Sequence, residues 1–147
     1  MPKRTGVRRL TTSSKRKGDG YERELATYIN EKTGLQTAHR APLSGGGMVG
    51  LSGGADIIGV PELFIEAKRV ERLNFLDAIR QAERNKQKTN SPEIPVVINR
   101  RNRMATGESL CLVRLDDFLK LYVSHLKEMG CHANSEMPTM PTKKDNF

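Results

Sequence analysis

The apolar residues of the chain recur at helical spacing in three segments, which predicts three helices. These segments are 21–33, a stretch that begins after Asn74, and 116–129. Gly34 follows the first helix and Gly130 the last, and glycine is the residue that most often ends a helix. Asp19 is a suitable N-terminal cap for the first helix, and Asp116 or Asp117 for the third.

The third predicted helix carries large apolar residues at the spacing of one helix face. They are Phe118, Leu119, Leu121, Tyr122, Leu126 and Met129. Such a face most often packs against a protein core. A contact between two copies of the chain is the alternative.

Apolar runs of strand length lie before and after the second helix. They cover 35–40, 55–58, 63–68, 94–98 and 110–115. Gly59 to Glu62 form a turn of hairpin length between the second and third of these runs. With three strands before the second helix and two after it, the order of elements predicts an α/β (α+β) fold, in which helices flank a mixed central β-sheet.

Charged residues interrupt the apolar strands of this hairpin. Side chains alternate along a strand, so Glu66 and Lys68 lie on the same face. A turn over the four residues after Ile58 places Asp56 within about one residue of Glu66 across the hairpin. Two carboxylates at such range repel each other unless a cation lies between them, and hard oxygen ligands suit Mg²⁺, with Mn²⁺ as a substitute. The alternative is a Glu66–Lys68 ion pair at the surface of a sheet edge.

Glu22 is a third acid in an unfavourable place. At 100° per residue it falls within the apolar stripe of the first helix, beside Leu25 and Ile29. Glu24 and Glu31 fall outside that stripe, on the solvent side. Because a carboxylate in a core-facing stripe is costly without a partner, Glu22 is the acid that we expect to have one. The alternative is a simple interaction with the helix dipole in the first turn.

The 147 residues suffice for one domain with a modest core. The formal net charge is +8, and the first 17 positions hold seven Lys and Arg residues but no acid. We expect a disordered basic arm over 1–17, one folded domain over 18–130 and a flexible tail over 131–147. A basic arm attracts nucleic acid or an anionic membrane surface, and a merely solubilising tail is the alternative.

No apolar run approaches the roughly 20 residues that span a bilayer, and the N-terminus lacks the apolar segment of a secretory signal. We therefore expect a cytoplasmic protein that does not enter a membrane. Cys111 and Cys131 do not combine with the three histidines in a zinc-binding spacing. Both are expected to be ordinary thiols of a reducing compartment.

Four successive stretches carry a family resemblance: KGDGYERELATYI, HRAPLSGG, GGADIIG and LFIEAKR. In this order they resemble the motifs of archaeal-type Holliday-junction resolvases, within the wider PD-(D/E)xK nuclease superfamily. The resemblance covers roughly Lys17 to Arg69. The Asp56 motif lacks the proline of many superfamily members. The segment after Lys68 lacks the aromatic pair of a resolvase dimer contact.

The resemblance implies a role for each matching residue. Glu22, Asp56 and Glu66 would hold the metal and its water, and Lys68 would lie beside the attacking oxygen. The positions that match the family's DNA contacts are Lys17, Arg23, Arg40, Ser44 and Arg69. The resemblance further implies that 18–130 is a nuclease domain, and that a Mg²⁺-dependent homodimer cuts a DNA four-way junction in recombination and repair.

Three hypotheses for the function therefore remain open. The first is a Holliday-junction resolvase, and the second is a nuclease of the same superfamily that acts on other DNA, of the restriction, repair or single-strand type. The third is a DNA-binding protein without catalysis, whose carboxylates serve structure. Gln81 has no assigned role. The run 99–103, which reads NRRNR, is either a second phosphate-contacting loop or a solvated turn.

Overall fold

The computed structural model describes residues 12–42 and 54–131, with side chains described from residue 16 onward. The chain divides into two compact units, Met1–Val113 and Arg114–Phe147. The boundaries expected from the sequence, 18–130 for the folded domain, differ from this division and stay a prediction.

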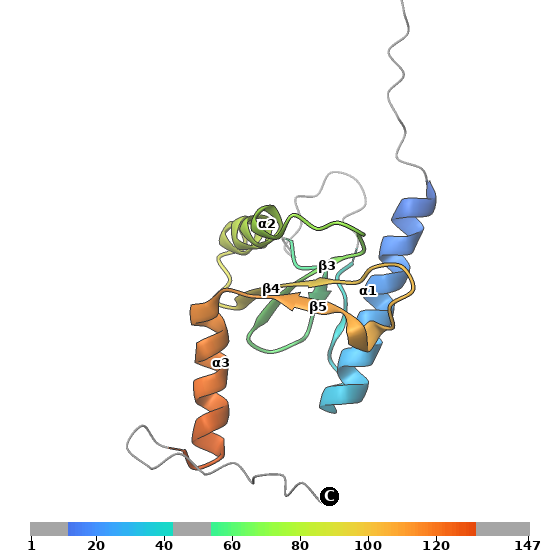
Figure 1. Ribbon diagram of the computed structural model, residues 1–147. Helices are drawn as coiled ribbons and strands as arrows, with labels where there is room; N and C mark the ends of the chain where they lie inside the picture. The colour runs from blue at the N-terminus through green and yellow to red at the C-terminus, as the bar shows by residue number, and fades with distance from the viewer. Residues whose placement is uncertain (1–11, 43–53, 132–147) are drawn as a thin grey trace, which may run out of the picture. The chain divides into compact units, whose positions relative to one another are not determined.

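The first unit is a mixed β-sheet with helices (Figure 1). In chain order it contains α1 (Thr12–Thr33), β1 (His39–Arg40), β2 (Ile57–Ile58), β3 (Leu63–Lys68), α2 (Phe75–Lys88), β4 (Ile94–Asn99), the 3-10 helix η1 (Thr106–Glu108) and β5 (Leu110–Leu112). The five strands lie in the order β1-β2-β3-β4-β5, and only β3 and β4 are parallel neighbours. The predicted mixed sheet and the predicted order of helices and strands are confirmed.

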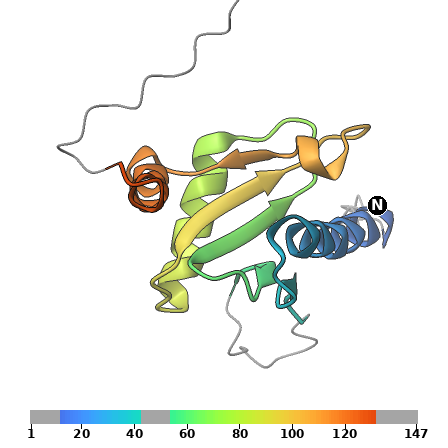
Figure 2. The same ribbon diagram turned by 90° about the horizontal axis from the view of Figure 1, so that it is seen from below.

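The two helices of this unit cover opposite faces of the sheet, as Figures 1 and 2 show together. On the α1 face, Tyr21 and Leu25 pack with Ile65 and other strand residues. On the α2 face, Ile79 packs with Val97. Side chains of a strand alternate between the two faces, so β3 directs Ile65 to the α1 core and Glu66 towards α2. The alternation predicted for β3 is therefore observed.

The β2–β3 hairpin requires a glycine at position 59. Gly59 has φ +79°, and a Cβ there would lie 1.9 Å from the carbonyl oxygen of Thr37. Thr37 also donates its hydroxyl hydrogen to the Gly59 carbonyl at 2.6 Å. The turn is thus clamped to the segment that leads into β1, and this fixes the closed end of the hairpin, opposite to the open end where Asp56 lies.

Several expected boundaries are wrong. α1 begins at Thr12, so residues 12–17 belong to a helix and not to a structureless arm, and Asp19 lies within that helix instead of capping it. The expected strand 35–40 is reduced to its last two residues, because Asn30 of α1 binds the backbone N–H and carbonyl of Ala38 and holds the preceding segment out of the sheet.

Two other elements can be compared with the expected ones. α2 begins after Asn74 as expected and extends to Lys88, and the 3-10 helix η1 was not predicted. Asn74 caps α2 by accepting a hydrogen bond from the Asp77 N–H at 3.1 Å. Residues 1–11 of the expected arm and 132–147 of the expected tail lie outside the described residues.

The second unit contains one described helix, α3 (Leu115–Glu128). Arg114, not Asp116 or Asp117, occupies the N-cap position, and Gly130 ends the segment with φ +76° as expected. The core face predicted for this helix stays a prediction, because the two units are described separately. None of its residues is buried, and Phe118, Leu119, Tyr122 and Met129 are each exposed by 42 to 60%.

Candidate functional site

Asp56 is fixed at the open end of the hairpin by its own backbone and side chain. Its N–H donates to the Ile65 carbonyl at 2.8 Å, and its Oδ2 accepts from the Ala67 N–H at 2.8 Å. Because β2 and β3 are antiparallel with Ile57 opposite Ile65, Asp56 lies opposite Glu66. The close approach of these two acids, predicted from the turn length, is confirmed.

Glu66 is the buried acid of the pair, with only 3% of its surface exposed. Its Oε1 accepts a hydrogen bond from the Asn85 side chain of α2 at 2.8 Å. Its Oε2 lies 3.7 Å from the Lys68 ammonium, which also donates to Gln81 Oε1 at 3.3 Å. α2 therefore holds both charged ends of the Glu66-Ala67-Lys68 sequence in place.

The electrostatics of Asp56 show that three acids interact here. Its pKa is raised to about 7 because burial disfavours the charged form, and the charges of Glu66 and then Glu22 raise it further. The Ala67 N–H and the Lys68 ammonium oppose these effects without cancelling them. The site thus has an excess of negative charge that a cation would relieve.

Glu22 is held from the other side by Arg40. The Nε of Arg40 lies 2.5 Å from Glu22 Oε2, and its Nη2 lies 2.6 Å from Asp19 Oδ1. The hydrogen bond to Glu22 is the main reason that the pKa of Arg40 is raised. The expected partner of Glu22 therefore exists, and it is an arginine of β1. A contact of Arg40 with DNA stays a prediction.

The other predicted DNA-contacting residues lie in different places. Lys17 and Arg23 are exposed on α1, and Arg69 is half-buried directly after β3. Ser44 lies outside the described residues. The described part of the predicted contact set is thus divided between α1, β1 and the end of β3.

The sequence reasoning missed Asn85 and left Gln81 without a role. The two residues are four apart on α2, the spacing that puts side chains on one helix face. Glu66 and Lys68 are two apart on β3, the spacing that puts them on one strand face. The two spacings could have been used as a signal. Together they predict that the polar side chains of the helix face the charged side chains of the strand.

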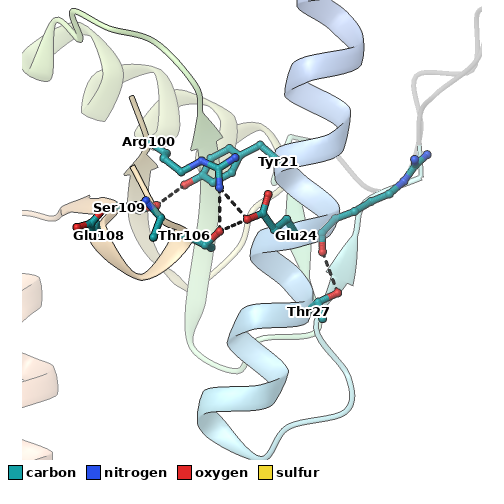
Figure 3. A network of polar contacts seen from close by, with 9 residues as sticks. Tyr21, Glu24, Thr27, Arg100, Thr106, Glu108 and Ser109 are labelled. Atoms are coloured by element: carbon teal, nitrogen blue, oxygen red, sulfur yellow. Dashed lines mark hydrogen bonds and ion pairs between the residues drawn. The ribbon is translucent and has the colours of Figure 1, made fainter. Parts of the chain in front are cut away.

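A second polar network joins α1 to the segment between β4 and β5 (Figure 3). Arg100, exposed by only 7%, donates from Nη1 to Glu24 at 2.8 Å and to Thr106 at 2.9 Å, and its guanidinium lies 4.7 Å from the centre of the Tyr21 ring. Tyr21 donates its hydroxyl hydrogen to Ser109 at 3.0 Å. Burial raises the pKa of Tyr21, and the Arg100 hydrogen bond lowers the pKa of Glu24.

Glu24 is exposed, as the sequence analysis expected, but it also has an ion-pair partner that the sequence analysis did not predict. Thr106 also donates a hydrogen bond to its carboxylate. The partner Arg100 is 76 residues away in the chain, so no local pattern reveals the pair.

The residues of the site fit a hard divalent cation by their chemistry. Asp56 and Glu66 supply adjacent carboxylate oxygens, and burial together with the charge of Glu66 raises the pKa of Asp56. Among the residues described, no group of three or more His, Cys, Asp or Glu side chains is placed to hold a metal ion. The role of Glu22 as a third ligand stays a prediction, since Arg40 engages its Oε2.

Comparisons of the chain with protein-family models, with curated protein sequences and with solved structures gave no match. Among the described helices, none is both long and apolar enough to cross a membrane.

Proposed function

We propose that the chain is a metal-dependent endodeoxyribonuclease of the PD-(D/E)xK type that cuts branched DNA as a Holliday-junction resolvase. One observation carries the proposal. The half-buried carboxylate of Asp56 and the buried carboxylate of Glu66 are adjacent across the hairpin, and the Lys68 ammonium lies 3.7 Å from Glu66. This is the set of groups that hydrolysis of a phosphodiester needs.

Each residue of the candidate site would have its own role in the reaction. Asp56 and Glu66 would hold Mg²⁺, which when bound supplies positive charge that makes a water nucleophilic and offsets charge on the phosphate. Lys68, oriented by Gln81 and Glu66, lies where it can neutralise charge that develops on a phosphate oxygen. Asn85 restricts the rotation of the Glu66 carboxylate, and this preserves its direction towards Asp56.

The preference for four-way junctions and the homodimer rest on the resemblance of the sequence motifs. Two cuts in a four-way junction need two sites, so a two-fold dimer is the assembly expected for such an enzyme.

The deciding experiment compares four-way junction, duplex and single-stranded DNA in the presence and absence of Mg²⁺. We expect Mg²⁺-dependent cleavage of the junction. Asp56→Asn should lower the rate by at least about 100-fold, since it removes a carboxylate from the cation, while junction binding is retained. Glu31→Gln, the same acid-to-amide change at an exposed position of α1, should cleave like the wild type.

The outcomes separate the rival functions. Preferential cutting of duplex or single-stranded DNA would favour a nuclease for another substrate. DNA binding without any Mg²⁺-dependent product would favour a DNA-binding protein without catalysis. Undiminished cleavage by Asp56→Asn would overturn the proposed site.

A further inference from the structure

Two loops leave the sheet at the same edge. β3 and β4 are parallel, so both end at one edge, and the segments 69–72 and 100–103 follow them there. Figure 2 shows the arrowheads of β3, in green, and β4, in yellow, at that edge. Because Lys68 is the last residue of β3, the first of these loops starts one residue after the candidate site.

The two loops are joined by hydrogen bonds into one surface. The Asn99 side chain accepts from the Val70 N–H and donates to the Val70 carbonyl, both at 3.2 Å. The Arg100 N–H donates to the Lys68 carbonyl at 3.0 Å, and the Asn102 N–H donates to Glu71 Oε1 at 2.7 Å. We call residues 69–72 and 100–103 together the two-loop surface.

Arginines dominate the composition of the two-loop surface. It contains Arg69, Arg72, Arg100, Arg101 and Arg103 against the single acid Glu71. Glu24 neutralises Arg100. Arg72, Arg101 and Arg103 are exposed, and none of their side chains has a hydrogen bond or ion pair with another described residue. The surface therefore presents arginine charge that no described acid offsets.

Two further features indicate that this surface binds an anion. The Nε atoms of Arg69 and Arg100 are both buried and have no hydrogen-bond partner among the described residues, so the positive charge of this surface is incompletely compensated from within the fold. Arg103 has φ +64°, a conformation that non-glycine residues seldom adopt and that is concentrated at ligand-binding loops. In addition, Arg100 is bound to Glu24 and Tyr21 of α1 and to Thr106 of η1 (Figure 3), so the loop that carries Arg101 and Arg103 has a rigid base.

We propose that the two-loop surface binds the sugar-phosphate backbone of DNA next to the candidate nuclease site, with Arg101 and Arg103 as the exposed phosphate contacts. Planar guanidinium groups match phosphate oxygens in pairs, and several of them along one edge suit a polyanion better than a single small anion. The identification of the polyanion as DNA rests on the proposed function. The surface would hold the strand on one side of the scissile phosphate.

The test uses the full chain and a fluorescently labelled four-way junction. Arg101→Gln with Arg103→Asn removes two charges, and asparagine tolerates the positive φ of position 103. Binding is measured by anisotropy without divalent cations over a range of salt concentrations. We expect the affinity at about 0.1 M salt to fall about tenfold, and the slope of log K against log salt to fall by about two.

Two further variants make the result specific. Arg101→Lys with Arg103→Lys keeps both charges, so it should recover most of the salt slope. Lys86→Ala with Lys88→Ala is the control, because it also removes two charges. Both lysines lie at the C-terminal end of α2, which precedes the start of β4 and therefore lies at the opposite edge of the sheet from the two-loop surface. This pair should change the affinity less than twofold.

The outcomes distinguish this proposal from the proposed function. A double variant that binds the junction with the affinity and salt slope of the wild type overturns the two-loop surface, even if the wild type cleaves. Loss of affinity and slope supports the surface, even if no Mg²⁺-dependent cleavage is found. A wild-type chain that binds no DNA overturns it as well.

Discussion

At the scale of single residues, the protonation of Asp56 links the stability of the fold to pH. A carboxyl of this kind titrates near 3.8 in the unfolded chain, and in the fold its pKa is about 7. Between these values the folded protein binds a proton that the unfolded chain releases. Folding is therefore favoured at the acid end of this range, and the advantage is lost as the pH rises through 7.

This linkage predicts a pH dependence of stability that Asp56 causes. Without divalent cations, the free energy of unfolding of the wild type should fall between about pH 4 and 8. This fall should exceed that of Asp56→Asn over the same range by about 2–4 kcal/mol. The asparagine can still accept from the Ala67 N–H. Urea unfolding of both proteins across this range measures the difference, and added Mg²⁺ should reduce it by binding the folded wild type.

The matched comparison is Glu31→Gln, which changes an exposed acid of α1. Its stability should follow that of the wild type at every pH. The linkage would be refuted if Asp56→Asn and Glu31→Gln showed the same dependence on pH as the wild type.

At the scale of helices and strands, the sequence predicts what depends on neighbours in the chain. The order of the elements follows from apolar spacing, and the approach of Asp56 to Glu66 follows from a turn of four residues. The alternation along β3 places Glu66 and Lys68 on one face without any tertiary information.

The sequence does not predict what depends on distant partners. The bond between Arg100 and Glu24 joins residues 76 positions apart, and the 3-10 helix that it supports, η1, has no apolar periodicity of its own. Similarly, α1 begins at Thr12 in a segment so basic and polar that its composition favours disorder. The pair and the start of α1 were missed for the same reason, which is that both depend on more than the local sequence pattern. Such a pattern contains no information about a distant ion-pair partner, and it does not show how far a helix extends beyond its buried face.

Arg100 provides a prediction at this scale, since it connects α1 to the segment between β4 and β5. Arg100→Ala should lower the free energy of unfolding by about 1–2 kcal/mol, because the half-exposed Glu24 and the buried Thr106 lose a charged partner and the Tyr21 ring loses its cation. Amide exchange in 100–109 should also become faster than in the rest of the first unit.

The neighbouring arginine is the control for this prediction. Arg101 is exposed, so Arg101→Ala should change the free energy of unfolding by no more than about 0.5 kcal/mol. Equal stability of the two variants would mean that the network does not stabilise the fold.

At the scale of the whole molecule, α3 belongs to a separate unit and carries an apolar face. At 100° per residue, one continuous side of this helix carries seven apolar residues: Leu115, Phe118, Leu119, Tyr122, Val123, Leu126 and Met129. None of them is buried, although Phe118 and Tyr122 stack with ring centres 6.2 Å apart. An exposed apolar stripe of this length indicates an interface.

The charges beside this stripe favour a second copy of the same helix as its partner. Asp116 and Lys127 are 11 residues apart, so they lie on the same flank of the stripe near opposite ends of α3. In an antiparallel pair each Asp116 would lie near the Lys127 of the other copy, and the helix dipoles would also be opposed. The homodimer expected from the sequence resemblance would then form through α3.

If the dimer forms through α3, acidic residues placed in the apolar stripe should separate the two copies. Phe118→Glu with Tyr122→Glu places four carboxylates in the contact, two from each copy, so the mass measured by light scattering should fall from that of a dimer to that of a monomer. Ser124→Glu adds a carboxylate on the opposite side of the same helix and should leave the dimer intact. Because both variants retain the candidate site, the double variant should also lose paired cutting of the junction and retain single cuts. A dimer that persists in Phe118→Glu with Tyr122→Glu would exclude α3 as the contact.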